Sequence, residues 1–200
     1  MNHEPVCLPA ARIWTIGHST RTFDEFLSLL RANGISRLAD IRTIPQSRRH
    51  PHFSRAALDD RLKAEGIEYR HFPELGGLRK PRPDSANSAW QNAAFRGYAD
   101  HMQTKAFREA VGELVVFGGR VSPAEVERRD SPYVQQETRA AVMCAEAVWW
   151  RCHRMLLSDA LLGRGVDVQH ILSDAKTQPH RLTPFAKVSE AGEVSYPGLV

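Results

Sequence analysis

The chain has 200 residues, of which 42% are hydrophobic, 25% charged and 8% aromatic. This balance excludes a disordered chain, a collagen-like repeat and a coiled coil. No apolar run approaches the roughly 18 uncharged residues that a membrane span needs, and the first residues lack the basic and apolar regions of a signal peptide. We therefore expect one cytoplasmic domain with no membrane partner.

Positive charge is concentrated in one stretch of the chain. The net charge is +4, from 27 Lys and Arg against 23 Asp and Glu. Residues 42–55 hold four arginines and no acidic residue, and Arg79, Lys80 and Arg82 form a second basic cluster. Because clustered charge of one sign attracts anions, we expect an anionic small molecule or a nucleic acid as partner.

The predicted elements begin after residues 1–11, which show no periodicity and are assigned to an N-terminal tail. Short apolar runs predict about five strands, over residues 13–16, 35–41, 67–72, 140–144 and 166–172. Helical spacing predicts helices that follow the capping residues Thr22 and Ser54 and that span about 94–103, 104–117 and 151–162. The polar segment 118–139 is interpreted as an insertion in a domain of residues 12–175, and residues 176–200 as a C-terminal tail.

Alternating strands and helices indicate β-α-β units, and hence an α/β fold with a single, mostly parallel sheet flanked by helices. In open sheets of this kind, ligands bind beyond the carboxyl ends of the strands. We therefore expect a pocket at that edge. The residues that follow the strand ends there are His18 and Ser19; Arg42, Ser47 and Arg48; Gly76 and Gly77; and Glu146, Cys152 and Arg154.

The order of these motifs resembles the domain-of-unknown-function family number 488. That family has a Gly-His-Ser loop, an Asp-x-Arg followed by Pro and Ser, a Leu-Gly-Gly, a Cys-x-Glu and a Cys-His-Arg. The chain has Gly17-His18-Ser19, Asp40-Ile41-Arg42 with Pro45 and Ser47, Leu75-Gly76-Gly77, Cys144-Ala145-Glu146 and Cys152-His153-Arg154. The resemblance runs from about residue 13 to 172. It implies an α/β fold and no particular activity, and the 118–139 segment is longer than the usual connection.

Cys152 is the candidate nucleophile. The three cysteines, an odd and low number, favour free thiols over a disulfide framework. A thiol beside cationic groups near a helix N-terminus has a lowered pKa. The alternative is that Cys152 packs as a small apolar side chain. His18 and Glu146 are candidates for proton transfer, although Glu146 could instead pair with an arginine.

An anion would be held by Arg42, Ser47, Arg48 and Arg154, with Ser19, Gly76 and Gly77 at the same edge. Ser19 could equally cap a helix, and the two glycines could form a turn. The two-residue period of a strand places Asp40 and Arg42 on one face. For Asp40 we therefore expect a structural role, such as pairing with Arg42.

The sequence lacks the signatures of several functional classes. Cys144 and Arg151 are seven residues apart, whereas a cysteine phosphatase needs six, and Glu146 would repel phosphate from that loop. Cys144 is therefore expected to be buried. Cys144, Cys152 and His153 do not have zinc-site spacing, so no metal is expected. Neither a Gly-x-Gly-x-x-Gly nor a Walker lysine occurs, and no cofactor is expected.

These observations favour an enzyme that acts on a phosphate-bearing ligand, a nucleotide or nucleic acid, through a reactive cysteine. Two alternatives remain open. One is a non-catalytic nucleic-acid-binding module in which Trp149 or Trp150 stacks on bases. The other is a redox-sensing thiol protein with Cys144 as the resolving thiol.

Overall fold

The computed structural model describes residues 11–46, 49–119 and 138–198. Within these ranges a six-stranded sheet has the order β3-β2-β4-β1-β5-β6. Its strands are β1 (Arg12–Gly17), β2 (Arg37–Asp40), β3 (Glu68–His71), β4 (Ala140–Cys144), β5 (Asp167–Ile171) and β6 (Thr177–Pro179). The first five strands are parallel and β6 is antiparallel to β5. The predicted α/β class with a mostly parallel sheet is confirmed, and the sixth strand lies in the segment assigned to the C-terminal tail.

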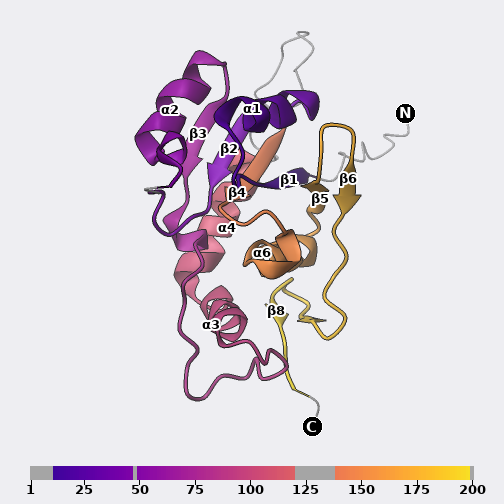
Figure 1. The fold of residues 1–200 in the computed structure, drawn as a ribbon. Helices are drawn as coiled ribbons and strands as arrows, with labels where there is room; N and C mark the ends of the chain where they lie inside the picture. Colours follow the sequence, from indigo (N-terminus) through magenta and orange to yellow (C-terminus); the bar gives the residue numbers. More distant parts are fainter. Residues whose placement is uncertain (1–10, 47–48, 120–137, 199–200) are drawn as a thin grey trace, which may run out of the picture.

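Helices cover both faces of the sheet (Figure 1). They are α1 (Phe23–Ala32), α2 (Arg55–Ala64), α3 (Ala93–Met102), α4 (Lys105–Phe117) and α6 (Arg154–Gly163). The buried side chains of α1 and α2, such as Phe26 and Leu58, pack with Met143 in one core. Those of α4 and α6, such as Leu114 and Leu157, pack in a second core on the opposite face. Each face of the sheet is therefore shielded from water, as a parallel sheet requires.

The helices begin at side chains that satisfy free backbone amides. The Thr22 hydroxyl accepts from the Glu25 amide at 3.2 Å, and the Glu25 carboxylate accepts from the Thr22 amide at 2.7 Å. This is the predicted capping box. Ser54 caps α2 by accepting from the amide of Ala57 at 3.4 Å. The sequence thus sets where α1 and α2 begin, and with them the lengths of the loops that precede them.

After the neighbouring strands β1 and β4, the chain continues on opposite faces of the sheet. From β1 it runs through α1 on one face to β2, and from β4 it runs through α6 on the other face to β5. Such a switch point is where open α/β sheets bind ligands. The two loops pair there, because the His18 amide donates to the Cys144 carbonyl at 3.0 Å and the Ser19 amide to the Ala145 carbonyl at 2.9 Å.

Residues after β6 continue to pack on the domain. The hairpin of β7 (Lys187–Val188) and β8 (Val194–Ser195) lies near α6, and the Tyr196 side chain is fully buried. Most of the predicted 118–139 insertion and nearly all of the N-terminal tail lie outside the described residues. In the described part of the chain, no helix is both long and apolar enough to cross a membrane.

Candidate functional site

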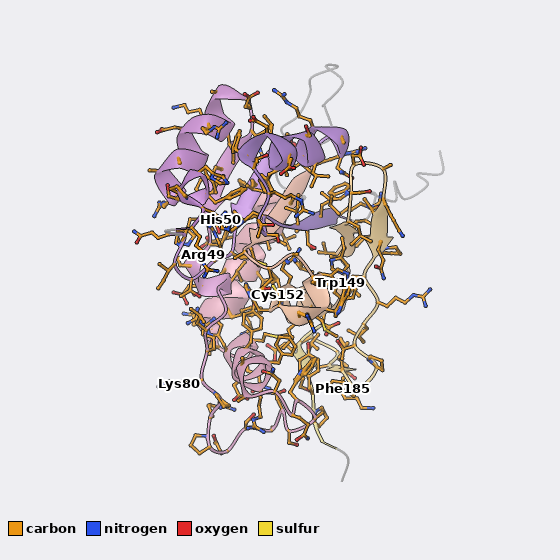
Figure 2. The ribbon with its side chains drawn as sticks, in the orientation of Figure 1. Arg49, His50, Lys80, Trp149, Cys152 and Phe185 are labelled. Carbon is orange, nitrogen blue, oxygen red and sulfur yellow. The ribbon has the colours of Figure 1, made fainter. Side chains whose placement is uncertain are left out.

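A pair of thiols lies at the switch point. Cys144 is the last residue of β4, and Cys152 precedes α6 by two residues. Their sulfur atoms are 3.0 Å apart, and both thiols are free and buried, with Cys152 only 4% exposed. Figure 2 places Cys152 near the middle of the molecule rather than at its periphery. The predicted burial of Cys144 is confirmed, and the nucleophile candidate has a second sulfur in contact.

His153 can accept the proton of Cys152. Its Nε2 lies 3.2 Å from the carbonyl oxygen of Ile41. A carbonyl only accepts, so this nitrogen carries the hydrogen of the neutral ring. That leaves a lone pair on Nδ1, which is 3.7 Å from Cys152 Sγ. His153 was not among the predicted catalytic residues, although its place beside Cys152 in the sequence was a signal for such a role.

The surroundings drive the pKa values of the two thiols apart. The pKa of Cys152 is held well below the usual thiol value, mainly because Cys144 donates a hydrogen bond to its sulfur, with further help from His153 and Arg154. Burial and the neighbouring Cys152 raise the pKa of Cys144 well above that value. These opposite shifts favour Cys152 as the thiol of the pair that ionises first.

Arg154 holds the loop between the two cysteines. Its backbone amide, at the start of α6, donates to Cys152 Sγ at 3.4 Å. Its guanidinium Nη2 donates to the carbonyls of Glu146 at 2.6 Å and Ala147 at 3.1 Å. The side chain is only 1% exposed, and its Nε is a buried donor without an acceptor among the described residues. The Glu146 side chain itself is exposed, so its contact with Arg154 runs through the backbone.

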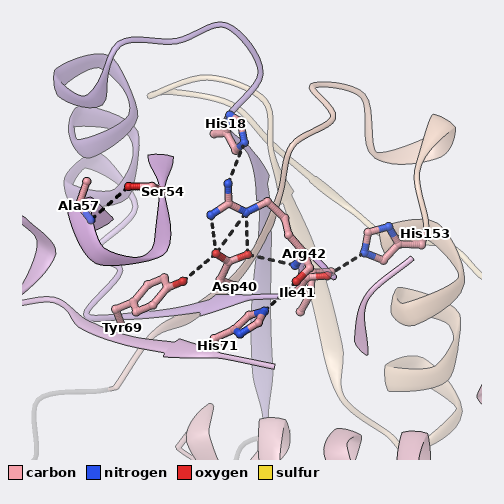
Figure 3. A network of polar contacts seen from close by, with 9 residues as sticks. All are labelled: His18, Asp40, Ile41, Arg42, Ser54, Ala57, Tyr69, His71 and His153. Carbon is pink, nitrogen blue, oxygen red and sulfur yellow. Dashed lines mark hydrogen bonds and ion pairs between the residues drawn. The ribbon is translucent and has the colours of Figure 1, made fainter. Parts of the chain in front are cut away.

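Asp40 and Arg42 form a buried ion pair beyond the end of β2 (Figure 3). The Arg42 Nη2 lies 2.5 Å from Asp40 Oδ2, and Arg42 Nε lies 2.9 Å from Oδ1. Tyr69 donates its hydroxyl to the same carboxylate at 2.8 Å, and His71 Nε2 donates to the Arg42 carbonyl at 2.8 Å. The expected structural role of Asp40 thus has direct support. An anion that binds Arg42 would compete with this carboxylate.

His18 is neutral and lies between this ion pair and an aromatic ring. Its Nδ1 donates to the Ser19 carbonyl at 3.0 Å, and its Nε2 faces Arg42 Nη1 at 3.4 Å. The ring stacks on Phe53 with centroids 4.2 Å apart. Burial, and next the charge of Arg42, lower the pKa of His18 to about 4. At neutral pH His18 can accept a hydrogen bond, but it is not a proton donor through Nε2.

The loop after β3 lies against the thiol site. The Thr43 hydroxyl donates to the Gly77 carbonyl at 2.8 Å. A Cβ at Gly77 would lie 2.9 Å from His153 Nδ1, so only glycine lets the backbone lie so close to the ring. The structure therefore brings Gly77 against the His153 ring, whereas Gly76 lies against Thr43. Ser47 and Arg48, predicted to hold an anion, lie outside the described residues.

A second buried polar network adjoins the site and was not predicted. His180 Nε2 donates to Asp159 at 2.9 Å, His170 Nε2 to His180 Nδ1 at 3.0 Å, and Thr15 to His170 Nδ1 at 2.7 Å. The carboxylate only accepts, so His180 Nε2 is the donor of that bond, and the other two directions follow when both imidazole rings are neutral. Trp149 stacks on His170 with centroids 3.9 Å apart. Its ring face is therefore occupied on that side, whereas Trp150 is half exposed.

We expect Gly17→Ala to lower the free energy of unfolding by about 1–3 kcal/mol, since overpacking forces backbone shifts. A Cβ at Gly17 would overlap the carbonyl oxygen of Glu146 and approach Arg154 Nη2 to 2.9 Å. The matched control is Gly112→Ala in α4, where a Cβ meets nothing within 4 Å; there alanine should add about 0.5–1 kcal/mol of stability. Urea unfolding measures both, and equal effects of the two variants would contradict the close approach at Gly17.

Comparison with known proteins identifies one family. The model of the family described as Domain of unknown function DUF488 matches residues 22–120. This range contains Asp40, Arg42 and the Gly76-Gly77 pair, whereas His18 and both cysteines lie outside it. No curated protein and no solved structure matches. Over residues 22–120, about half of its length, the chain is thus similar to the DUF488 family.

Proposed function

We propose that the protein is a thiol-dependent enzyme in which Cys152 is the nucleophile and Cys144 is the resolving thiol. The observation that carries this proposal is the 3.0 Å separation of the two sulfur atoms. His153 Nδ1, at 3.7 Å, serves as the base that takes the Cys152 proton. The lowered pKa of Cys152 and the raised pKa of Cys144 fit a thiolate attacker and a protonated partner.

The substrate class that suits this pair is a small disulfide, R–S–S–R. The Cys152 thiolate attacks one sulfur, an S–S bond forms to Cys152, the S–S bond of the substrate breaks, and the departing RS⁻ takes the proton from His153. The Cys144 sulfur then attacks Cys152 Sγ, and the second RS⁻ leaves with the proton of Cys144. The two thiols are oxidised to one disulfide while the substrate is reduced to two thiols.

The predicted action on a phosphate-bearing ligand has weaker support. Arg42 is paired with Asp40, and Arg154 donates to backbone carbonyls. To bind phosphate, Arg42 would have to give up its carboxylate partner, and Arg154 is only 1% exposed. Of the two tryptophans that the nucleic-acid-binding alternative offers for stacking on bases, Trp149 already stacks on His170, which leaves the half-exposed Trp150. We therefore favour thiol chemistry over both.

The pH dependence of alkylation tests the nucleophile. The rate of iodoacetamide modification is measured for each cysteine, with the sites resolved by mass spectrometry. We expect the Cys152 rate to titrate well below the value of about 8.5 for a free thiol. His153→Gln should move this titration upward, because the hydrogen bond and charge of the imidazole are lost. A Cys152 rate that titrates like a free thiol overturns the proposal.

Thiol–disulfide exchange tests the division of roles between the two cysteines. The third cysteine of the chain, Cys7, is first replaced by serine. This reduced Cys7→Ser protein reacts with bis(2-hydroxyethyl) disulfide, and the products are identified by mass. We expect the parent to end as the Cys144–Cys152 disulfide, Cys144→Ser to stop at a mixed disulfide on Cys152, and Cys152→Ser to react at least 100-fold more slowly, roughly the advantage of an activated thiolate. Equal rates for the two serine variants would contradict these roles.

A further inference from the structure

A cavity of about 320 Å³ lies away from the thiol site. It is bounded by the end of α3, the start of α4, the end of α6 and the β7–β8 hairpin. Met102 and Val194, each 5% exposed, bring apolar atoms to it, and Arg108, Arg164 and Glu193 bring charge. A concave site of this size with an apolar wall and a few polar groups is typical of small-molecule binding.

The charged side chains that line the cavity carry a net positive charge. Arg108 Nη1 lies 3.1 Å from the Glu193 carboxylate and 3.0 Å from the Gln103 carbonyl. Arg164 Nη1 donates to the Ala160 carbonyl at 3.1 Å. Among the lining residues, two guanidinium groups therefore face one carboxylate. Burial lowers the pKa of Arg164, Glu193 opposes this effect, and Arg108 adds to it to a lesser extent.

The wall formed by the hairpin is held tightly against α6. Gly192, in the hairpin turn, has a φ of +76°, and a Cβ added to Gly163 would lie 2.6 Å from the Gly192 carbonyl oxygen. Such close backbone approach fixes the hairpin relative to the end of the helix. The ion pair of Arg108 with Glu193 joins the same hairpin to α4. The cavity is therefore formed before any ligand enters.

We propose that this cavity binds a small organic monoanion, with its anionic group against Arg164 and Arg108 and its apolar part against Met102 and Val194. One negative charge balances the excess of one guanidinium. The planar guanidinium of arginine suits a carboxylate or phosphate oxygen pair. The site is independent of the proposed thiol chemistry, since none of its lining residues belongs to the Cys152 site.

Calorimetric titration with acetate, hexanoate and inorganic phosphate tests the proposal on the full chain. We expect hexanoate to bind at least tenfold more tightly than acetate, roughly the contribution of its extra apolar groups. Arg164→Gln should weaken hexanoate binding about tenfold through loss of a charge-assisted contact. Inorganic phosphate should bind no more tightly than acetate, because it lacks the apolar part.

A variant with the opposite expected effect on affinity distinguishes a role in ligand binding from a purely structural role. Glu193→Gln removes the only carboxylate among the lining residues and frees Arg108, so it should tighten hexanoate binding severalfold. Arg31→Gln, in α1 on the other face of the sheet, is the matched control and should change nothing. The proposal is overturned if hexanoate does not bind, if Glu193→Gln and Arg164→Gln both weaken binding, or if Arg31→Gln weakens it equally.

Discussion

Replacing Asp159 with alanine should lower the free energy of unfolding by about 3–5 kcal/mol, the usual cost of leaving buried charged or polar partners without each other. Asp159 lies fully buried on α6. It accepts hydrogen bonds from His180 Nε2 at 2.9 Å, from the Thr183 amide at 2.9 Å, from the Thr183 hydroxyl at 2.6 Å and from the Tyr196 hydroxyl at 2.8 Å. The variant leaves all of these donors buried and unpaired.

Urea unfolding, followed by circular dichroism, measures this loss. Asp174→Ala is the control, because Asp174 is exposed and accepts only from the amide of its neighbour Ala175 among the described residues; it should stay within about 0.5 kcal/mol of the parent. Because Asp159 holds residues 180–196 on α6, hydrogen exchange should also rise in that segment. A loss below about 1 kcal/mol would contradict the role of Asp159 as the centre of the network.

Acid should destabilise the protein between about pH 6.5 and pH 3. Burial lowers the pKa of His170 to about 3, with further contributions from His180 and Arg154, and burial and Arg42 lower that of His18 to about 4. Unfolded histidine titrates near 6.5, so the unfolded chain binds more protons in this interval. The stability is fully present above 6.5 and falls as the pH drops toward the folded values, by up to about 1.4 kcal/mol per pH unit for each histidine.

The free energy of unfolding, measured by urea titration from pH 8 to pH 4, should therefore decline steeply below 6.5. His170→Gln and His18→Gln should each flatten this decline, whatever their effect on stability at neutral pH. His52→Gln serves as a control, since His52 is only half-buried and bonds through Nε2 to the Arg21 carbonyl. If the two glutamine variants keep the slope of the parent, the buried histidines are not its source.

Local sequence patterns predicted the helices and strands well, because helix caps and apolar runs depend only on residues close together in the sequence. The capping box at Thr22 and the apolar run 140–144 sufficed to predict α1 and β4, which the structure places within a residue or two. The period of a strand likewise predicted the contact of Asp40 with Arg42. By contrast, β6 at Thr177–Pro179 is polar and exposed along its length, so no hydrophobic pattern marks it.

Contacts that depend on strand order could not be predicted from the sequence. His153 reaches the Ile41 carbonyl, across 112 positions of sequence, only because β4 lies beside β2. Asp159 sits in an ordinary helical pattern, and its partners His180 and Tyr196 lie in a segment without periodicity. The Cys144–Cys152 contact needs only a short loop, and the sequence predicted it only as one of several alternatives. In each case the sequence did not show which residues lie next to each other in the folded chain.

The position of β4 has a consequence for synthesis of the chain. This strand lies between β1 and β2 and pairs with both, yet it follows them by about a hundred residues. A chain leaving the ribosome can pair β2 with β3 early, because they are consecutive and joined by α2. The centre of the sheet closes only once residue 144 has emerged. Until then, the unpaired edges of β1 and β2 can pair with wrong partners. The time needed to translate residues 41–144 therefore sets a lower limit on the folding time. It also defines the period during which chaperones can protect these edges.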